Sequence, residues 1–253
     1  MDRRQAEPDD AIGAGAGDNV EALRLFCFPY AGGGQPIFRR WQEGTLENVE
    51  VHPVELPGRG RQLSTPAARR IHALVDAVLD GIGPLVGRRF AFFGHSMGAL
   101  LSFEVARALR ARHGVEPVAL YVAAQPAPHL PSRQQLVHGL SDAALRAELR
   151  RIGGTPPEVL ANDEFMALLL PTLRADFEAC ETYSYSESEL LHCPIVAYGG
   201  SEDSEVTEEH LWAWAELTTG AFALAMLPGG HFFVDENRQV LLAALNASLK
   251  LWH

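Results

Sequence analysis

The chain has 253 residues, of which 47% are apolar, and its 21 basic and 32 acidic side chains give a net charge of −11. A chain of this length and composition buries a core unaided, which excludes disulfide scaffolds, collagen-like chains and wholly disordered proteins. The cysteines Cys27, Cys180 and Cys193 are widely spaced and form no CxxC pair, so we expect buried thiols of a reducing compartment and no metal site.

The N-terminus carries no leader pattern. Residues 1–20 are rich in Asp, Gly and Ala and lack an apolar stretch, and no later run reaches the roughly 18 uncharged apolar residues of a membrane span. We therefore expect a flexible tail over 1–20, a single domain over 21–253, and a cytoplasmic, monomeric protein that does not bind membranes.

Short apolar runs alternate with segments of helical period along the rest of the chain. The predicted strands cover residues 23–28, 49–56, 90–93, 118–123, 195–198 and 222–227, and the predicted helices cover 35–43, 67–85, 97–112, 207–217 and 236–249. This alternation predicts the α/β class, with a mostly parallel sheet flanked by helices on both faces.

About 70 residues separate the predicted strands 118–123 and 195–198, which is more than one crossover needs. Helical patterns at 140–152 and 164–183 predict a helical insertion, with bounds near 128–192. The second helix is apolar nearly all round, and Pro171 is expected to kink or break it. It is either a helix buried in a larger core or a lid whose second apolar face lines a substrate pocket.

The strongest motif is Gly94-His95-Ser96-Met97-Gly98, which lies between a predicted strand and a predicted helix. This context is typical of a nucleophile elbow, in which a sharp turn exposes a serine hydroxyl at the carboxyl end of a sheet. We therefore predict Ser96 as a nucleophile, and the alternative is a simple glycine-rich turn.

A serine nucleophile needs a base and an orienting carboxylate, which follow in the order Ser, Asp or Glu, His in this class of fold. Asp203 follows the predicted strand 195–198, and His231 follows the strand 222–227. We predict these two residues as the acid and the base, with Glu202 and Glu205 as competitors for the acid. His95 is expected to have a packing or supporting role.

Two backbone N–H groups must hold the oxyanion that forms during acyl transfer. We expect one from Met97 and the other from Tyr30, with Ala31 as the alternative, in the glycine-rich loop after the first strand. Neither a GxGxxG pattern nor a Walker lysine accompanies this loop, so no nucleotide cofactor is expected.

The chain resembles the type II thioesterases of polyketide and nonribosomal peptide synthesis. The resemblance rests on the motifs at 28–33 (FPYAGG), 56–59 (LPGR), 94–99 (GHSMGA) and 229–232 (GGHF), together with the Asp203 loop. It implies an α/β-hydrolase fold with an inserted helical lid, and Ser96, Asp203 and His231 as the triad.

The resemblance also implies a substrate: a stalled or wrong acyl unit on the phosphopantetheine arm of an acyl or peptidyl carrier protein. Two alternatives use the same triad, namely a general carboxylesterase or lipase-like hydrolase, and a cyclising or transferring enzyme. A noncatalytic binder is disfavoured because all three triad positions are filled.

The charges divide unevenly along the chain. Residues 34–151 carry 15 basic and 10 acidic side chains, a net charge of +5, whereas 152–253 carry 3 and 16, a net charge of −13. The overall charge argues against nucleic acid as a partner. Because carrier proteins are usually acidic in this family, we expect docking on arginine-bearing surfaces, which comprise Arg39, Arg40, Arg59, Arg61, Arg133, Arg146, Arg150 and Arg151.

Overall fold

The computed structural model describes residues 22–83, 86–87, 89–131 and 136–252. Six parallel strands form one sheet in the order β2-β1-β3-β4-β5-β6. The strands are β1 (Leu23–Phe28), β2 (Val49–Pro53), β3 (Phe90–His95), β4 (Leu120–Ala123), β5 (Ile195–Gly200) and β6 (Phe222–Leu227). The predicted parallel sheet is confirmed, and the predicted tail lies outside the described residues.

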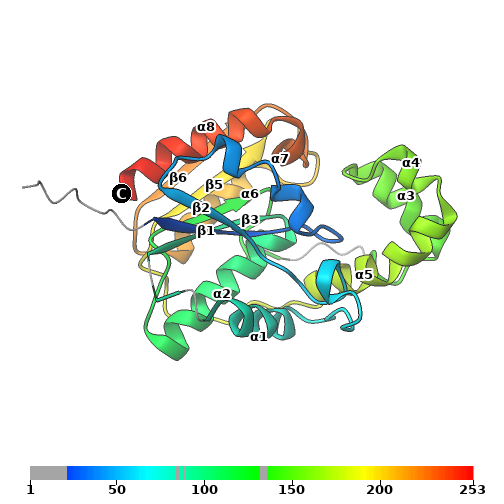
Figure 1. Ribbon diagram of the computed structural model, residues 1–253, viewed down its shortest axis with the longest axis horizontal. Helices are drawn as coiled ribbons and strands as arrows, with labels where there is room; N and C mark the ends of the chain where they lie inside the picture. The colour runs from blue at the N-terminus through cyan, green and yellow to red at the C-terminus, as the bar shows by residue number, and fades with distance from the viewer. Residues whose placement is uncertain (1–21, 84–85, 88, 132–135, 253) are drawn as a thin grey trace, which may run out of the picture.

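Helices cover both faces of this sheet (Figure 1). The α-helices are α1 (Ile71–Ile82), α2 (Met97–His113), α3 (Asp142–Ile152), α4 (Pro157–Leu160), α5 (Asp163–Glu181), α6 (Glu208–Trp212), α7 (Phe233–Glu236) and α8 (Arg238–Leu249). The 3-10 helices are Gln35–Phe38, Gln42–Gly44, Gly60–Gln62, Ala213–Leu217 and Lys250–Trp252. The helix predicted over 35–43 is thus two short 3-10 helices, and α4 was not predicted.

The strands carry nearly continuous apolar runs because both faces of the sheet are covered. Successive side chains point to opposite faces, so Phe92 packs in the cluster under α1 and α2, while Phe93 packs in the cluster under α8. Trp41, from the segment between β1 and β2, packs edge-to-face against Phe93 with ring centroids 4.7 Å apart. The strand ends are therefore held in fixed positions by the core.

Helices α3, α4 and α5 form an insertion between β4 and β5 that extends from one end of the sheet (Figure 1). We call residues 142–181 the helical insertion. It has its own small apolar cluster, separate from the two clusters of the sheet, and the buried members are Val137, Leu145, Leu149, Leu160, Met166, Leu170 and Leu173. The extra helices predicted from the sequence are present, with bounds shifted by two residues or fewer.

Pro171 does not break α5. The helix runs without interruption from Asp163 to Glu181, and Pro171 lies exposed on its outer side. Because the proline ring faces solvent, the carbonyl that loses its helical partner lies on the same exposed side, where water can satisfy it. The predicted break is therefore wrong.

Candidate active site

Ser96 lies in the turn between β3 and α2, at the carboxyl end of the sheet. Its backbone has φ 53° and ψ −122°, a strained conformation for a residue with a side chain. A Cβ on Gly94 would lie 2.1 Å from the carbonyl oxygen of Gly98, and one on Gly98 would lie 2.1 Å from that of Phe28. Both glycines of the motif are thus required by close backbone approach.

The structure brings Ser96 together with the two side chains predicted to accompany it. His231 Nε2 lies 3.2 Å from Ser96 Oγ, and His231 Nδ1 lies 2.9 Å from Asp203 Oδ2. The imidazole is therefore bonded on one side to a carboxylate and on the other to a hydroxyl, which is the arrangement that lets a neutral histidine accept the serine proton.

Asp203, rather than either neighbouring glutamate, lies against the imidazole of His231. Its side chain is fully buried, and Oδ1 accepts hydrogen bonds from the backbone N–H groups of Glu205 and Val206 at 2.7 and 3.2 Å. Glu202 is exposed, and Glu205 pairs with Arg151 at the end of α3 at 2.8 Å. The loop geometry thus leaves only Asp203 facing the imidazole.

His95 contacts the loop that carries His231. Its side chain is fully buried, and Nε2 donates a hydrogen bond of 2.7 Å to the carbonyl oxygen of His231. Burial and the neighbouring charge of His231 lower the pKa of His95 to about 3. His95 is therefore neutral near pH 7 and fixes the backbone of the loop that carries His231.

The loop after β1 lies beside Ser96 and His231. Tyr30 and Ala31 line the same cavity as Ser96, and no described group accepts a hydrogen bond from the backbone N–H of either residue. The Tyr30 hydroxyl donates to Asp235 on α7 at 3.0 Å, which anchors the loop near His231. Burial raises the pKa of both the Tyr30 hydroxyl and the Asp235 carboxyl.

Met97 is the first residue of α2, so its N–H has no partner inside the helix. Met97, Tyr30 and Ala31 thus offer free N–H groups close to Ser96. The geometry does not choose between Tyr30 and Ala31 as the second donor.

A cavity of about 860 Å³ opens over Ser96 and His231. Its apolar wall includes Leu100 of α2, together with Leu149, Leu173 and Phe177 from the helical insertion. The volume suits a medium-sized organic group, and the serine hydroxyl lies at its wall. The insertion therefore shapes the space next to Ser96.

Residues 23–249 match the family model described as the Thioesterase domain. Gramicidin S biosynthesis protein GrsT of Aneurinibacillus migulanus is 43% identical over 234 residues, which cover 92% of this chain and 91% of that protein. The structure of the RedJ thioesterase from the prodiginine pathway of Streptomyces coelicolor superimposes with a TM-score of 0.84, at 42% identity over 89% of each chain. The type II thioesterase BorB from the borrelidin biosynthetic cluster gives a TM-score of 0.82 at 37% identity, over 88% of this chain and 91% of that one.

The chain belongs to the thioesterase family. It is an enzyme of the serine-hydrolase type with the α/β-hydrolase fold, as the resemblance of its motifs implied. No helix among the described residues has the length and apolar character needed to span a membrane. Nor does any group of three or more His, Cys, Asp or Glu side chains within the described ranges have an arrangement that could hold a metal ion.

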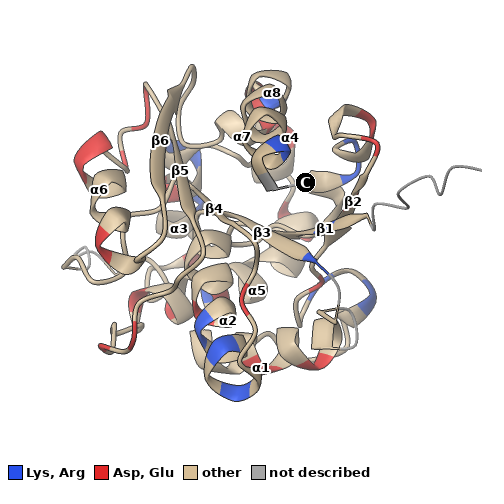
Figure 2. Cartoon of the chain, turned by 90° about the vertical axis from the view of Figure 1, so that its left-hand side faces the viewer, with Lys and Arg blue, Asp and Glu red and all other residues tan. Residues whose placement is uncertain are grey.

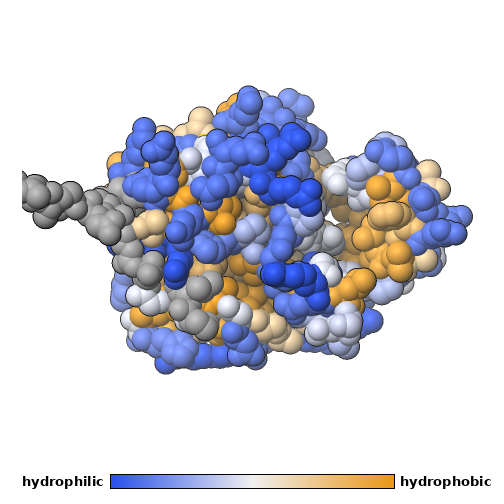
Figure 3. Space-filling view, in the orientation of Figure 1, coloured by the Kyte–Doolittle hydropathy of each residue, from blue (hydrophilic) through white to orange (hydrophobic). Residues whose placement is uncertain are grey.

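The second apolar face of α5 does not line the thioesterase cavity along its whole length. Leu173 and Phe177, in the C-terminal half, face the cavity. Phe165 and Leu168, in the N-terminal half, are 54% and 72% exposed. Apolar side chains are visible on the outer lobe of the molecule in Figure 3. Only the half of α5 near the sheet therefore fits the predicted role of a pocket wall.

The expected arginine surface is only partly present. Arg59 is 9% exposed and binds Asp176 of α5, so its assignment to a docking surface is wrong. Arg61, Arg146 and Arg151 pair with acidic side chains. Arg39, Arg40 and Arg150 are exposed and have no acidic partner among the described residues, whereas Arg133 lies outside those residues. In Figure 2 both basic and acidic residues occur on the helices and loops around the sheet.

Asp176 was missed by the sequence analysis. It is a fully buried carboxylate on α5 that bonds both Arg59 and the loop after β1. An acidic residue within an otherwise apolar helix is a signal that could have been noticed, because buried charges need partners. Its partners, however, are more than 100 residues away in the chain.

Proposed function

We propose that this thioesterase hydrolyses acyl groups from the phosphopantetheine arm of acyl or peptidyl carrier proteins through an acyl-Ser96 intermediate. The observation that carries the proposal is the bonded series Ser96, His231 and Asp203 at the wall of the 860 Å³ cavity. The similarity to BorB, a type II thioesterase from the borrelidin biosynthetic cluster, supports the substrate class. A cytoplasmic location accompanies this role.

In the first step His231 Nε2 takes the Ser96 proton while Oγ attacks the thioester carbonyl. Negative charge develops on the carbonyl oxygen, where the N–H of Met97 and that of Tyr30 or Ala31 stabilise it. The carbon–sulfur bond then breaks, and His231 gives the proton it took from Ser96 to the departing sulfur, so that a thiol leaves and the imidazole is neutral again. The thiol leaves readily because its reference pKa is near 8.5. The acyl group remains on Ser96 Oγ.

In the second step His231 accepts a proton from water, which attacks the acyl-Ser96 carbonyl. The same N–H groups hold the second oxyanion, and His231 returns its proton to Oγ as the free acid leaves. Asp203 keeps Nδ1 protonated throughout, so that Nε2 is available as the base.

The deciding test is a panel of acyl groups on carrier protein, on a small thiol and as oxygen esters, with wild-type protein and Ser96→Ala. We expect hydrolysis of the carrier-bound thioesters to exceed that of the oxygen esters, with free acid as the product. Ser96→Ala should lower turnover by on the order of 10⁴-fold or more with the fold retained. Unchanged turnover would refute the assignment.

The same panel separates the alternatives. Preference for oxygen esters would indicate a carboxylesterase, and a cyclic or transferred product in the mass spectrum would indicate a cyclising or transferring enzyme.

A further inference from the structure

Asp176 is a buried carboxylate outside the triad that reaches the loop beside Ser96. It lies on α5, its side chain is fully buried, and its Oδ2 accepts a hydrogen bond of 2.7 Å from the backbone N–H of Gly32. Gly32 follows Tyr30 and Ala31, which line the same cavity as Ser96. A charged acceptor on a backbone N–H makes a stronger bond than a neutral one.

The turn that Asp176 holds has a defined geometry. The N–H of Gly33 donates to the carbonyl of Tyr30 at 2.9 Å, and Gly32 has φ +76°. These features are typical of a turn with glycine at its third position. If the peptide between Ala31 and Gly32 were reversed, its carbonyl oxygen would face the carboxylate instead of its N–H. Asp176 therefore disfavours the reversed turn.

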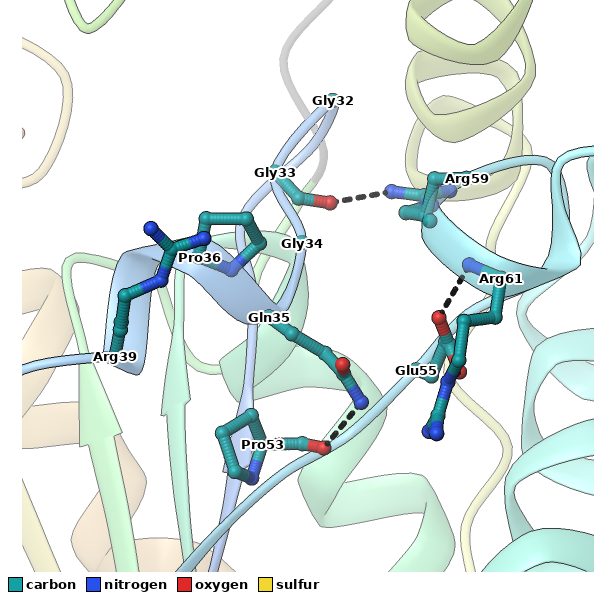
Figure 4. A pocket seen from close by; sticks show the side chains of 11 residues that line it. Gly32, Gly33, Gly34, Gln35, Pro36, Arg39, Pro53, Glu55, Arg59 and Arg61 are labelled. Atoms are coloured by element: carbon teal, nitrogen blue, oxygen red, sulfur yellow. Dashed lines mark hydrogen bonds and ion pairs between the residues drawn. The ribbon is translucent and has the colours of Figure 1, made fainter. Parts of the chain in front are cut away.

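Arg59 binds both Asp176 and the turn. Its two terminal nitrogens donate to Asp176 Oδ2 and Oδ1 at 2.8 and 2.6 Å, and one of them also donates to the carbonyl of Gly33 at 3.0 Å. Figure 4 shows Arg59 reaching the Gly32–Gly34 loop from the neighbouring segment. The bidentate pair neutralises the buried carboxylate, and it holds the turn at two points, the N–H of Gly32 and the carbonyl of Gly33.

Helix α5 contacts the same loop through apolar atoms. A Cβ on Gly32 would lie 2.3 Å from Leu173 Cδ2, so the helix lies directly against the backbone of the turn. One turn before Asp176, the Thr172 hydroxyl donates to the carbonyl of Gly58 at 3.0 Å, which fixes the segment carrying Arg59. Leu173 also lines the cavity over Ser96.

We propose that Asp176, together with Arg59, is a positioning unit that holds the second oxyanion donor in place from helix α5. The inference deepens the proposed function and rests on it, because an oxyanion donor matters only if Ser96 forms a tetrahedral intermediate. The unit acts on the transition state, since the loop N–H groups bind the oxyanion more strongly than the ground-state carbonyl.

The test compares Asp176→Asn with the double variant Arg59→Met/Asp176→Leu. In Asp176→Asn an amide oxygen is retained but the charge is lost. In the double variant apolar side chains replace the buried ion pair, which is often neutral or favourable for stability, but no acceptor for the Gly32 N–H remains. We expect kcat to fall about 10-fold in the first and about 100-fold in the second, with KM within threefold.

Glu116→Gln is the matched control. Glu116 also accepts two backbone N–H groups, those of His192 and Cys193 at 2.8 and 2.9 Å, and pairs with Arg110 at 3.3 Å. It precedes β4 and contacts the segment before β5, at the end of the sheet opposite Ser96. We expect its kcat to stay within twofold of wild type, because it holds backbone remote from the nucleophile.

A second measurement, which does not depend on protein stability, is the inhibition constant of a trifluoromethyl ketone analogue of the acyl thioester. The analogue forms a tetrahedral adduct with Ser96 whose oxyanion needs the loop donors, so its inhibition constant should rise in proportion to the loss of kcat in both Asp176 variants. Thermal unfolding is measured alongside. If the double variant fails to fold, Asp176→Asn decides by the same two measurements.

The inference would be overturned if folded Asp176→Asn and the folded double variant both kept the kcat and the inhibitor affinity of the wild type. It would also be overturned if their loss of kcat were no larger than that of Glu116→Gln. A loss of kcat with unchanged inhibitor affinity would also overturn it. Failure of the proposed function is a separate result, because it would appear as undiminished turnover in Ser96→Ala.

Discussion

The sheet and the helical insertion are stabilised in different ways. The sheet lies between two clusters of buried apolar side chains that include Trp41, Phe92 and Phe93. Most buried apolar side chains of the insertion form one small cluster of their own. The insertion contacts the sheet region through the apolar side chains of Leu173 and Ala179 and through ion pairs, among them Arg59 with Asp176 and Arg69 and Arg70 with Glu178. The sheet region positions Ser96, Asp203 and His231, and the insertion forms part of the cavity wall.

The two regions therefore have different roles around Ser96. Strand ends fixed by a dense core keep Ser96, Asp203 and His231 at bonding distance, which acyl transfer requires. The insertion contacts each loop around them: Asp176 binds the loop after β1, Arg151 binds Glu205 beside the acid, and a Cβ on Gly154 would lie 2.3 Å from the ring of Phe232.

The largest effect, a loss of kcat, is expected for a residue at the end of a strand. Asp203→Asn should lower kcat by about 10³- to 10⁴-fold, because an amide no longer holds His231 in the tautomer that leaves Nε2 free. Steady-state hydrolysis of an acyl thioester measures the loss. The neighbouring Glu202→Gln serves as control, since Glu202 is exposed and should change kcat by less than twofold. Comparable losses in the two variants would contradict the assignment of Asp203.

Cavity-forming substitutions in the two regions should separate their stabilities. Trp41→Ala removes a fully buried side chain from the cluster under α8 and should lower the free energy of unfolding of the whole domain by about 3–5 kcal/mol. Met166→Ala, in the insertion cluster, should loosen α3–α5 locally with a smaller change in the global transition.

Denaturant unfolding and limited proteolysis followed by mass spectrometry distinguish these outcomes. Cleavage within 142–181 of Met166→Ala under native conditions is the expected result. An equal global destabilisation in both variants, without local cleavage, would show that the insertion and the sheet unfold as one unit.

Acidification should lower the free energy of unfolding through His95, the last residue of β3. Its pKa is near 3 in the folded protein but close to 6.5 in an unfolded chain, so the unfolded state binds more protons between these values. The contribution of His95 to the free energy of unfolding is fully present above pH 6.5. It declines as the pH falls towards 3, by up to about 1.4 kcal/mol per pH unit. His95→Gln, which retains an N–H donor for the His231 carbonyl but does not titrate, should have a shallower decline. Parallel curves of unfolding free energy against pH would contradict this.

The smallest effect is expected at the surface. Arg39 and Arg40 are exposed beside a cavity of about 570 Å³ that Arg39, Arg59 and Arg61 help to line. If carrier proteins dock there, Arg39→Glu/Arg40→Glu should weaken turnover of carrier-bound acyl groups several-fold and reduce its salt dependence. Turnover of the same acyl group on a small thiol should be unchanged. Arg112→Glu, on α2, is the control, and an equal loss in both would argue against this docking face.

Much of the fold and the site was predictable from local pattern. Alternating apolar runs and helical periods gave the sheet and its helices, and the glycines around Ser96 marked a turn that only glycine permits. Short-range geometry was less predictable: residues 35–44 form two 3-10 helices, the first of which contains Pro36, although their apolar spacing suggested one helix. The insertion helices were predicted, but the continuity of α5 through Pro171 was not, because it depends on which side faces solvent.

The sequence by itself determined which residues could react, since the order of Ser96, Asp203 and His231 at strand ends follows from the chain and from the parallel sheet it encodes. Only the tertiary structure decided what the charged residues do. Arg59 and Asp176 are 117 positions apart, and the LPGR motif that ends at Arg59 does not show that this arginine is buried while Arg39 and Arg61 are exposed. One is buried against a carboxylate and the others face solvent, because the partner of a charge is set by the packing of distant elements and not by its neighbours in the chain.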